Sequence, residues 1–277
     1  MTTEATLYGS QANRRLTVRD LQSAKDRGEK WAMLTSYDAL TAGIFEQAGI
    51  PVLLVGDSVA NNVLGYDNTV PVTVQEMLPF VQAVVRGSKR ALVIADLPFG
   101  SYQASAAQAL ETSCVFMKQG GAHAIKLEGG RRVVAQVTEL VAAGVPVMGH
   151  IGLTPQSVNV LGGYRVQGRN AQAEELIADA VALTEAGAFA IVLELVPAEL
   201  AERITKEISI PTVGIGAGPA CDAQVLVWQD MAGMHEGPGP KFLRKFADVR
   251  TVLSDAARDY SDAVRTGAYP AEDHTYV

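Results

Sequence analysis

The sequence predicts an α/β fold, specifically a (βα)8 or TIM barrel, in which eight parallel strands alternate with helices. Short apolar runs recur along the chain with helical patterns between them, and four of these runs end on a carboxylate. A run that is apolar on both faces is typical of a parallel strand buried under helices. In a barrel the four acids would then stand at the mouth, where such enzymes carry their chemistry. The four runs are residues 52–57, 91–96, 124–128 and 190–194.

A weak repeat of helix, glycine and strand supplies the other strands. Gly49, Gly121, Gly144 and Gly187 each follow a helical pattern and precede an apolar run, as glycine does where it closes a helix in the left-handed conformation. A doubly wound open sheet is the alternative, and it is disfavoured because no dinucleotide-binding fingerprint follows the first strand. The further strands, which bring the number to eight, are residues 31–35, 147–150, 212–215 and 223–227.

Capping residues and apolar stripes predict the helices. An extra N-terminal helix over residues 10–28 opens at Thr17 and closes at Gly28, and it could cap the bottom of the barrel. Thr73 and Glu76 form the pattern of a capping box. The stripes that predict further helices are Leu110, Cys114 and Met117; Val133, Val137, Leu140 and Val141; Leu200, Ile204 and Ile208; and Phe242, Phe246, Val249, Leu253 and Ala256.

Length and composition favour one domain. The chain has 277 residues, of which 48% are hydrophobic, and α/β barrels of this length usually form a single domain. No linker-like change of composition interrupts the sequence. We therefore expect one barrel domain over residues 1–277, with loose tails at 1–12 and 266–277.

The bulk properties also limit the partners and the compartment. The net charge of −7 argues against a nucleic-acid-binding face, and no apolar run is long enough to span a bilayer. The polar first ten residues do not resemble a signal peptide. Cys114 and Cys221 provide no disulfide framework, which favours a reducing compartment. These observations predict a cytoplasmic protein with no nucleic-acid or membrane partner.

Three acids could bind a metal ion at the barrel mouth. Asp57 and Asp96 each follow an apolar strand, and Glu128 ends a third. Acids that converge repel one another unless a cation or a proton lies between them. Oxygen ligands without a histidine or cysteine cluster favour Mg²⁺ over Zn²⁺. The alternative, that each acid caps the next helix or pairs with a nearby Arg or Lys, stays open at this point.

Two further charged residues could take part in catalysis. Lys126 lies two positions before Glu128, so both side chains point to the same face of the strand. Such a lysine could hold a substrate carboxylate or an enolate oxygen, or it could form a structural ion pair. Glu194 stands among apolar neighbours, which raise the pKa of a carboxyl toward the range of a general base. It could equally cap the helix that follows.

Two weaker signals accompany these acids. Residues 214–218 form a glycine-rich segment after the seventh strand, where barrels often bind phosphate, although a tight turn explains it equally well. His150 ends the fifth strand. It could act as an acid or a base, but a lone histidine is more often a hydrogen-bonded structural residue.

Seven short strings occur in an order that resembles the ketopantoate hydroxymethyltransferase family. Each string alone is weakly specific, but the ordered set is strongly so, and the resemblance runs from about residue 17 to about residue 246. The strings are VGDS (55–58), LGYD (64–67), DLPF (96–99), KLEGG (126–130), GHIGLTPQ (149–156), LELVP (193–197) and GIGAG (214–218).

The resemblance implies a barrel of the phosphoenolpyruvate mutase and isocitrate lyase superfamily. It implies an enzyme of pantothenate and coenzyme A biosynthesis that transfers a hydroxymethyl group from 5,10-methylenetetrahydrofolate to 3-methyl-2-oxobutanoate. The products would be 2-dehydropantoate and tetrahydrofolate, formed through a Mg²⁺-stabilised enolate. The resemblance also implies a cyclic homo-oligomer, commonly a decamer, which the patterning alone does not require.

Site residues follow from the same resemblance by matching motifs. The residues that contact folate do not follow from the motifs. The resemblance assigns Asp57, Asp96 and Glu128 to the Mg²⁺ site, Asp57, Ser58, Asp96 and Lys126 to the oxo acid, and Glu194 to removal of the C3 proton.

Two other functions are compatible with such a barrel. A carbon–carbon lyase of the same superfamily would present a catalytic cysteine on a loop, but Cys114 falls in a helical pattern and Cys221 follows the glycine-rich segment. A non-catalytic barrel would have no use for Lys126, Glu128 and Glu194 beside two metal-type aspartates. The hydroxymethyltransferase is therefore the function that we expect.

Overall fold

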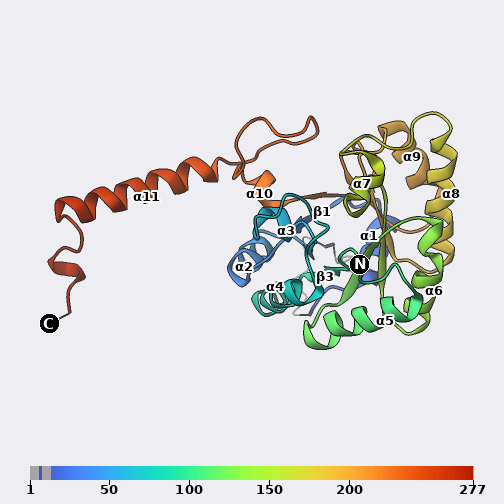
Figure 1. Ribbon diagram of the computed structural model, residues 1–277, viewed down its shortest axis with the longest axis horizontal. Coiled ribbons are helices and arrows are strands. Elements are labelled where there is room, and N and C mark those ends of the chain that lie inside the picture. The colour runs from blue at the N-terminus through green and yellow to red at the C-terminus, as the bar shows by residue number, and fades with distance from the viewer. Residues whose placement is uncertain (1–5, 8–13, 277) are drawn as a thin grey trace, which may run out of the picture. The chain divides into compact units, whose positions relative to one another are not determined.

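The computed structural model describes residues 6, 7 and 14–276 of the chain. It contains a closed barrel in which eight strands follow one another in sequence order, from β1 to β8 (Figure 1). Neighbouring strands are parallel, and β8 pairs with β1 to close the barrel. The predicted (βα)8 fold is therefore confirmed, and the open-sheet alternative is wrong.

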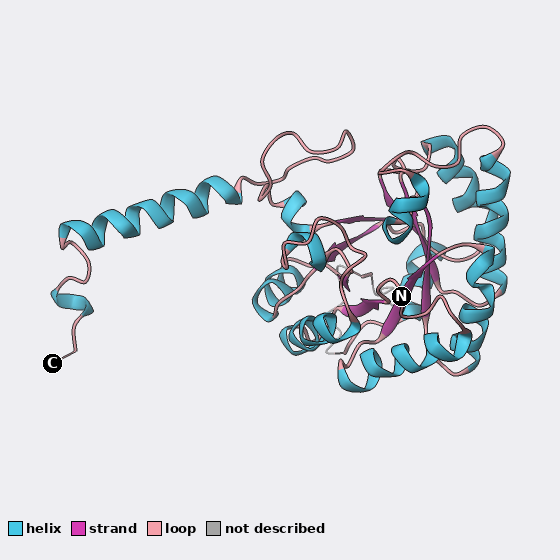
Figure 2. Ribbon diagram, viewed as in Figure 1, coloured by secondary structure: helices cyan, strands magenta, loops and turns pink. Residues whose placement is uncertain are grey.

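The strands lie where the apolar runs predicted them. Figure 2 shows them in the interior, with helices around them. Strands such as β2 and β4 are buried along their whole length, as expected of parallel strands that helices cover. The bounds are β1 Trp31–Thr35, β2 Val52–Val55, β3 Leu92–Asp96, β4 Ala124–Glu128, β5 Val147–Gly152, β6 Ala190–Glu194, β7 Thr212–Ile215 and β8 Ala223–Leu226.

Helices connect these strands and largely follow the predicted signals. The capping box is present, because the Thr73 hydroxyl accepts from the N–H of Glu76 and the Glu76 carboxylate accepts from the N–H of Thr73. The predicted stripe of α9 is buried, and so is most of that of α6. The α-helices are α1 Val18–Asp26, α2 Ala39–Gln47, α3 Val59–Asn62, α4 Val74–Gly87, α5 Ala106–Cys114, α6 Val134–Ala142, α7 Val158–Leu161, α8 Gln172–Glu185 and α9 Ala198–Glu207; shorter helices are η1 Val115–Gln119, η2 Arg131–Val133 and η3 Pro155–Ser157.

The segment with the stripe Leu110, Cys114 and Met117 is helical, as predicted, but this stripe is not its buried face. Ala109, Ser113 and Phe116 are buried there, whereas Cys114 is exposed. Small side chains let α5 pack closely against α6. The Ser113 hydroxyl can be buried because it donates to the carbonyl of Ala109 at 2.7 Å. The large apolar side chains of this segment therefore do not mark its buried face.

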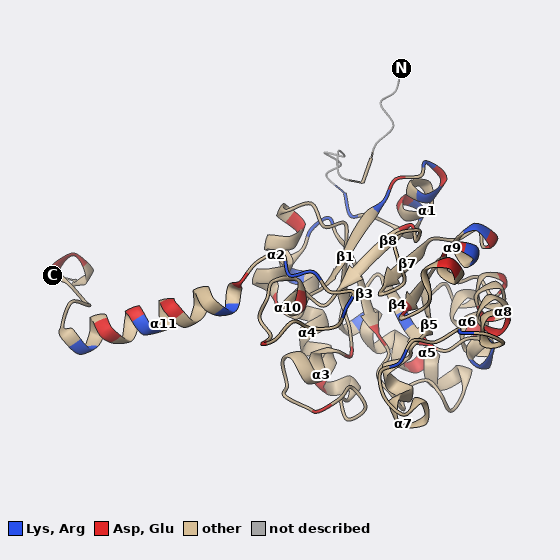
Figure 3. Cartoon of the chain, turned by 90° about the horizontal axis from the view of Figure 1, so that it is seen from above, with Lys and Arg blue, Asp and Glu red and all other residues tan. Residues whose placement is uncertain are grey.

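The extra N-terminal helix α1 closes one end of the barrel. Thr17 caps it and Gly28 follows its last turn with a positive φ, as predicted. Its buried side chains, Leu21 and Ala24, belong to the same core cluster as residues at the beginning of the strands, including Trp31. Figure 3 shows α1 at the end of the barrel opposite α3 and α7. Since parallel strands all run in one direction, the mouth at their carboxyl ends lies on the side of α3 and α7.

The chain divides into two compact units, Met1–Val227 and Trp228–Val277. The second unit contains α10 Trp228–Met231, α11 Val249–Thr266 and the short helix η4 Glu272–His274. None of the helices in the described ranges combines the length and the apolar composition that a bilayer crossing requires. The expectation of one domain over the whole chain stays a prediction, and the expected tail 1–12 lies largely outside the described residues.

The helical stripe predicted to begin at Phe242 is wrong in its first part. Helix α11 begins only at Val249, where the Asp248 side chain accepts from the N–H of Thr251. Before it, the N–H of Phe246 donates to the carbonyl of Met231, which is the last residue of α10. The segment before α11 therefore satisfies the carbonyl end of α10 and forms no helix of its own.

The side chains that point into the barrel are apolar in the first part of each of four strands and polar at the carboxyl end. On β3, Leu92 and Ile94 belong to the core cluster, and Asp96 is the next residue on the same face. Strands β4, β5 and β6 repeat this pattern. Ala124 is followed by Lys126 and Glu128 on β4, Met148 by His150 on β5, and Ala190 and Val192 by Glu194 on β6.

We expect Glu46 to stabilise the barrel away from the mouth. Its carboxylate accepts hydrogen bonds from the backbone N–H groups of Lys89, Arg90 and Ala91 at 2.6–3.0 Å. Burial alone would raise the pKa of Glu46, but these bonds hold it below 4.5. Urea unfolding of Glu46→Gln should show a loss of about 1–3 kcal/mol at neutral pH, because an amide oxygen cannot accept all of these bonds.

The pH dependence has a defined sign. A lowered folded-state pKa gives stability that is complete above the unfolded value and disappears as the pH falls through the folded value. The difference between wild type and Glu46→Gln should therefore shrink below about pH 4.5. Glu207→Gln, at an exposed position, is the control. A pH-independent difference for Glu46→Gln would contradict this role.

Candidate active site

The barrel mouth gathers the predicted acids around one buried lysine. Lys126 on β4 and Asp96 on β3 are register partners, and the Lys126 Nζ lies 2.8 Å from the Asp96 Oδ2. The backbone N–H of Asp57 donates to the same Oδ2 at 3.3 Å. Burial raises the pKa of Asp96 to about 7, although Lys126 opposes this shift. Burial would lower the pKa of Lys126, but the acids around it, Asp96 foremost, raise it, so the lysine stays charged.

Glu128 ends β4 on the other side of the lysine. It is buried, and its Oε2 accepts from the backbone N–H of Gln156 at 3.0 Å. Its Oε1 lies 3.5 Å from the Nδ1 of His150, which is beyond a normal hydrogen bond. Burial raises the pKa of Glu128 well above its ordinary value, and the charge of Asp57 adds to this shift.

His150 lies between the lysine and Glu194. Its Nδ1 is 3.3 Å from the Lys126 Nζ, and its Nε2 is 3.1 Å from the Glu194 Oε2, although this second pair is not aligned as a hydrogen bond. Burial, helped by the charge of Lys126, lowers the pKa of His150 well below 6.5. A neutral ring that accepts from Lys126 at Nδ1 carries its proton at Nε2, on the side of Glu194. His150 therefore belongs to the site, whichever of the two expected roles it has.

Glu194 does not cap the helix that follows it. The N-cap of α9 is Pro197, and no side chain caps that helix. Burial raises the pKa of Glu194 to about 7, close to neutral pH, where a general base works best. Gly152 of β5 allows the close approach of this strand, because a Cβ there would collide with the Glu194 carbonyl oxygen.

The capping alternative also fails for the two aspartates. Ser58 is the N-cap residue of α3 and Ser105 that of α5, so Asp57 and Asp96 cap neither helix. The other alternative, an ion pair with a nearby Arg or Lys, is confirmed for Asp96, which pairs with Lys126. The Asp57 Oδ2 accepts instead from the Gln156 side chain at 3.0 Å, and the Ser58 hydroxyl lies 2.7 Å from that of Tyr37.

The donor set fits a divalent cation. In the described part of the mouth, the carboxyl groups of Asp57, Asp96, Glu128 and Glu194 surround a single ammonium group, that of Lys126. Two buried carboxylate oxygens, Asp96 Oδ1 and Glu128 Oε1, have no hydrogen-bond partner there. The described His, Cys, Asp and Glu side chains form no ready-made cluster of three ligands. Substrate and water oxygens would therefore complete the coordination, as is usual for Mg²⁺, and the metal assignment stays a prediction.

Two uncharged residues, Gln156 and Tyr102, hold the acids in place, and sequence reasoning assigned them no role. The Gln156 Nε2 donates to Asp57 Oδ2 at 3.0 Å and to the Leu97 carbonyl at 2.9 Å. Its Oε1 lies 2.9 Å from the Tyr102 hydroxyl, which also accepts from the backbone N–H of Glu128. The only available signal was the position of Gln156 at the end of the string GHIGLTPQ.

The glycine-rich segment after β7 forms a close turn. Gly216 and Gly218 both have a positive φ, and a Cβ at Gly218 would crowd the side chain of Ala198 at the start of α9. The tight-turn interpretation accounts for these glycines. Phosphate binding at this segment stays an untested prediction.

Comparison with known proteins decides the family. The family model of ketopantoate hydroxymethyltransferase matches residues 15–272 of the chain. The chain belongs to this family. The resemblance and the prediction of an enzyme, a hydroxymethyltransferase, are thereby confirmed.

Curated relatives in the ketopantoate hydroxymethyltransferase family match almost the whole length of this chain. A relative from Frankia casuarinae, named 3-methyl-2-oxobutanoate hydroxymethyltransferase, is 64% identical over 95% of this chain and 88% of its own. A relative of the same name from Thermobifida fusca is 61% identical and covers 98% of this chain and 97% of its own.

Solved structures at low identity share the fold. Phosphoenolpyruvate phosphomutase from Streptomyces platensis has a TM-score of 0.62 at 14% identity, covering 95% of this chain and 92% of its own. A 2,3-dimethylmalate lyase of the phosphoenolpyruvate mutase and isocitrate lyase superfamily has a TM-score of 0.57 at 17% identity, covering 94% and 92%. These structures share the barrel fold, and membership of the superfamily stays a prediction.

We expect Gln156→Leu to destabilise the mouth. The substitution leaves Asp57 Oδ2 and the Leu97 carbonyl without this donor, and a buried unsatisfied group costs about 1–3 kcal/mol. Urea unfolding should detect this loss. Gln103→Leu removes an exposed amide that donates to Gln156 from outside and should change the stability less. Equal stability of Gln156→Leu and wild type would show that this amide does not hold the acids.

Proposed function

We propose that the protein transfers a hydroxymethyl group from 5,10-methylenetetrahydrofolate to 3-methyl-2-oxobutanoate, giving 2-dehydropantoate and tetrahydrofolate for pantothenate biosynthesis. The names of the curated relatives support the acceptor and the group that is transferred. One arrangement in the mouth carries the proposal: a charged lysine, acids with unpaired oxygens and a carboxyl with a pKa near 7 share one chamber.

The oxo acid would bind on the side of Asp57, Ser58, Asp96 and Lys126. Lys126 supplies the positive charge that a substrate carboxylate needs in a buried site. Asp57, Asp96 and Glu128 would hold Mg²⁺, which when bound acts as a Lewis acid that polarises the ketone of the substrate. The orphaned oxygens of Asp96 and Glu128 support this assignment.

Glu194 would remove the C3 proton of the oxo acid. His150, whose Nε2 lies 3.1 Å from the Glu194 Oε2, would orient the carboxylate for this step once the two groups align as a hydrogen bond. The C3 carbon then forms a bond to the methylene carbon of the folate, whose two bonds to nitrogen are broken. Water supplies the hydroxyl group of the product. The two nitrogens of tetrahydrofolate gain one proton that comes from C3 and one that comes from water.

A lyase with a catalytic cysteine loop is not supported. Cys114 is exposed at the end of α5, and Cys221 is buried just before β8, next to Asp222. Neither thiol is among the partners of Lys126 or Glu194 in the described residues. The groups available for catalysis in the mouth are therefore the Glu194 carboxyl, as a base, and Lys126, and not a thiol.

Glu194→Gln should lower both transfer and C3 proton exchange by about two to four orders of magnitude, the usual range for general base catalysis. Binding of the oxo acid in the presence of Mg²⁺ should remain, since the amide keeps the volume of the side chain. NMR of the oxo acid in D₂O without folate measures the exchange, and calorimetry measures the binding. Exchange at the wild-type rate would remove Glu194 from the mechanism.

Asp96→Asn should weaken binding of Mg²⁺ and of the oxo acid together, because the substrate completes the coordination of the metal. Calorimetric titration of the metal, with and without the oxo acid, tests this coupling. Circular dichroism and thermal unfolding must show that the variant is folded, since Asp96 also pairs with Lys126. Unchanged oxo-acid affinity in a folded variant would refute the assignment.

We also propose a cyclic homo-oligomer, a decamer in the cytoplasm. Helix α11 supports association, because Leu253, Tyr260 and Val264 form an exposed apolar stripe on a helix without buried residues. Sedimentation at micromolar concentration should show one large species. Leu253→Asp should reduce its size, whereas Ser254→Asp on the polar face should not. A wild-type monomer would contradict the proposal.

A further inference from the structure

A pocket of about 400 Å³ adjoins the mouth, within the range of roughly 300–1,000 Å³ typical of small-molecule sites. Glu128 and Gln156 line it, and the Gln156 amide is also the group that holds Asp57. A molecule in this pocket therefore lies next to the acids that would bind the oxo acid.

The pocket exposes two large apolar side chains. Phe99, from the loop after β3, is 49% exposed, and Val160 of α7 is 90% exposed. Val133, which is buried, adds a third apolar surface. A flat ring between Phe99 and Val160 would remove apolar area from water on both sides and stack on the phenyl ring.

Amide groups line the same pocket. The Asn159 side chain forms no hydrogen bond within the described part of the chain, and Gln103 and Gln136 also line this space. An uncharged amide both donates and accepts. The Gln103 and Gln136 amides donate to Gln156 and to the Tyr102 carbonyl. The Asn159 amide matches a heteroaromatic ring with amino and oxo substituents on one edge, whereas a purely apolar ligand would leave it unpaired.

We propose that this pocket binds the pterin ring of the folate co-substrate, between Phe99 and Val160. The proposal rests on the proposed function, which requires a folate donor beside the oxo acid. It names the contacts of the donor, which the family motifs do not give. Glu128 and Gln156 at the boundary of the two sites place the one-carbon unit of the folate next to the oxo acid.

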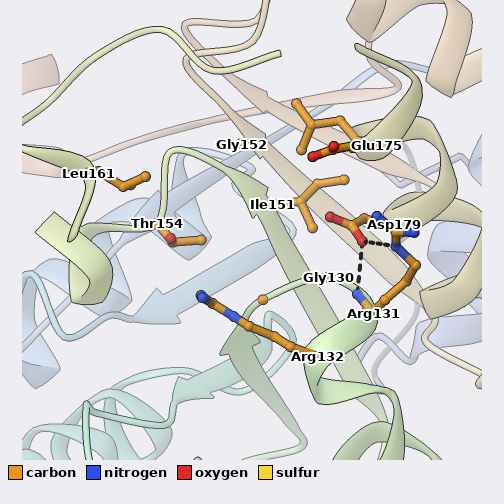
Figure 4. A pocket seen from close by; sticks show the side chains of 11 residues that line it. Gly130, Arg131, Arg132, Ile151, Gly152, Thr154, Leu161, Glu175 and Asp179 are labelled. Atoms are coloured by element: carbon orange, nitrogen blue, oxygen red, sulfur yellow. Dashed lines mark hydrogen bonds and ion pairs between the residues drawn. The ribbon is translucent and has the colours of Figure 1, made fainter. Parts of the chain in front are cut away.

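Arg132 would hold the carboxylate end of the folate. It donates to the Ser157 hydroxyl at 3.1 Å and pairs with no carboxylate in the described ranges. Its neighbour Arg131 is already engaged, with its Nε 2.8 Å from Asp179 Oδ1. Figure 4 shows Arg131 turned toward Asp179, whereas Arg132 extends away from this pair.

A second pocket, of about 530 Å³, continues from the first past Arg132, which lines both. It is larger, but it has none of the mouth acids in its lining, and Glu175 and Asp179 make part of it negative. The ring is therefore assigned to the smaller pocket. The benzoylglutamate portion would end at Arg132, because Glu175 and Asp179 would repel its carboxylates from the larger pocket.

Calorimetric titration with tetrahydrofolate, in the presence of Mg²⁺ and the oxo acid, tests the ring site. Phe99→Ala should raise the Kd about ten-fold through loss of stacking, and Val160→Asp should raise it further. Both positions are exposed enough for the variants to fold, which thermal unfolding verifies. Ile44→Ala, which shortens an exposed aliphatic side chain on α2, should bind like wild type.

The two adjacent arginines provide a matched pair for the carboxylate end. Arg132→Met should weaken tetrahydrofolate about ten-fold, as expected for a charge-assisted hydrogen bond at a partly exposed site. It should leave the affinity for tetrahydropterin, which has no benzoylglutamate, unchanged. Arg131→Met should change neither. Equal loss of both ligands in Arg132→Met would overturn the role of this residue.

C3 proton exchange without folate separates this proposal from the proposed function. Phe99→Ala and Val160→Asp should exchange at the wild-type rate while their KM for methylenetetrahydrofolate rises. Wild-type folate affinity in both variants would overturn the pocket and leave the function intact. A wild type that exchanges the C3 proton but binds no tetrahydrofolate would overturn the pocket and the donor together. Folate binding that depends on Phe99 in an enzyme without exchange would support the pocket and remove the proton-abstraction mechanism.

Discussion

The buried ion pair between Lys126 and Asp96 is the interaction on which the mouth depends. The barrel register places the two residues side by side on β3 and β4, so their pairing is built into the strand order. A buried charge without a partner is strongly destabilising, and here the same ammonium group also faces His150. It thereby fixes the proton of the imidazole on the side of Glu194. One cation therefore contacts Asp96 on β3 and His150 on β5, and His150 in turn faces Glu194 on β6.

The acids of the site could be predicted because they lie on strands. In a closed parallel barrel, alternation sends every second side chain to the axis, and the carboxyl ends meet at one mouth. Asp96, Glu128 and Glu194 therefore converge wherever the strands are recognised correctly. An ion pair of Lys126 was one of the two roles that the sequence allowed, and its partner is Asp96 on the neighbouring strand.

The supporting residues could not be predicted in this way. Gln156 and Tyr102 lie in loops and carry no charge, so neither periodicity nor chemistry distinguishes them from other polar loop residues. The buried face of α5 was missed because Ser113 satisfies its hydroxyl within the helix, which makes a polar residue behave as a small apolar one. Before α11, the N–H of Phe246 donates to the carbonyl of Met231 at the end of α10. The local sequence pattern cannot predict this hydrogen bond, because its two residues lie far apart in the chain.

Gln156 belongs to two neighbourhoods at once. Its side-chain amide donates to Asp57, and the same side chain lines the pocket beside the mouth. A ligand that shifts this amide from either side therefore changes the free energy of binding on the other side. Because such coupling is reciprocal, each of two neighbouring ligands alters the affinity of the other by the same factor. Cooperativity between the two proposed ligands would then depend on a single uncharged side chain.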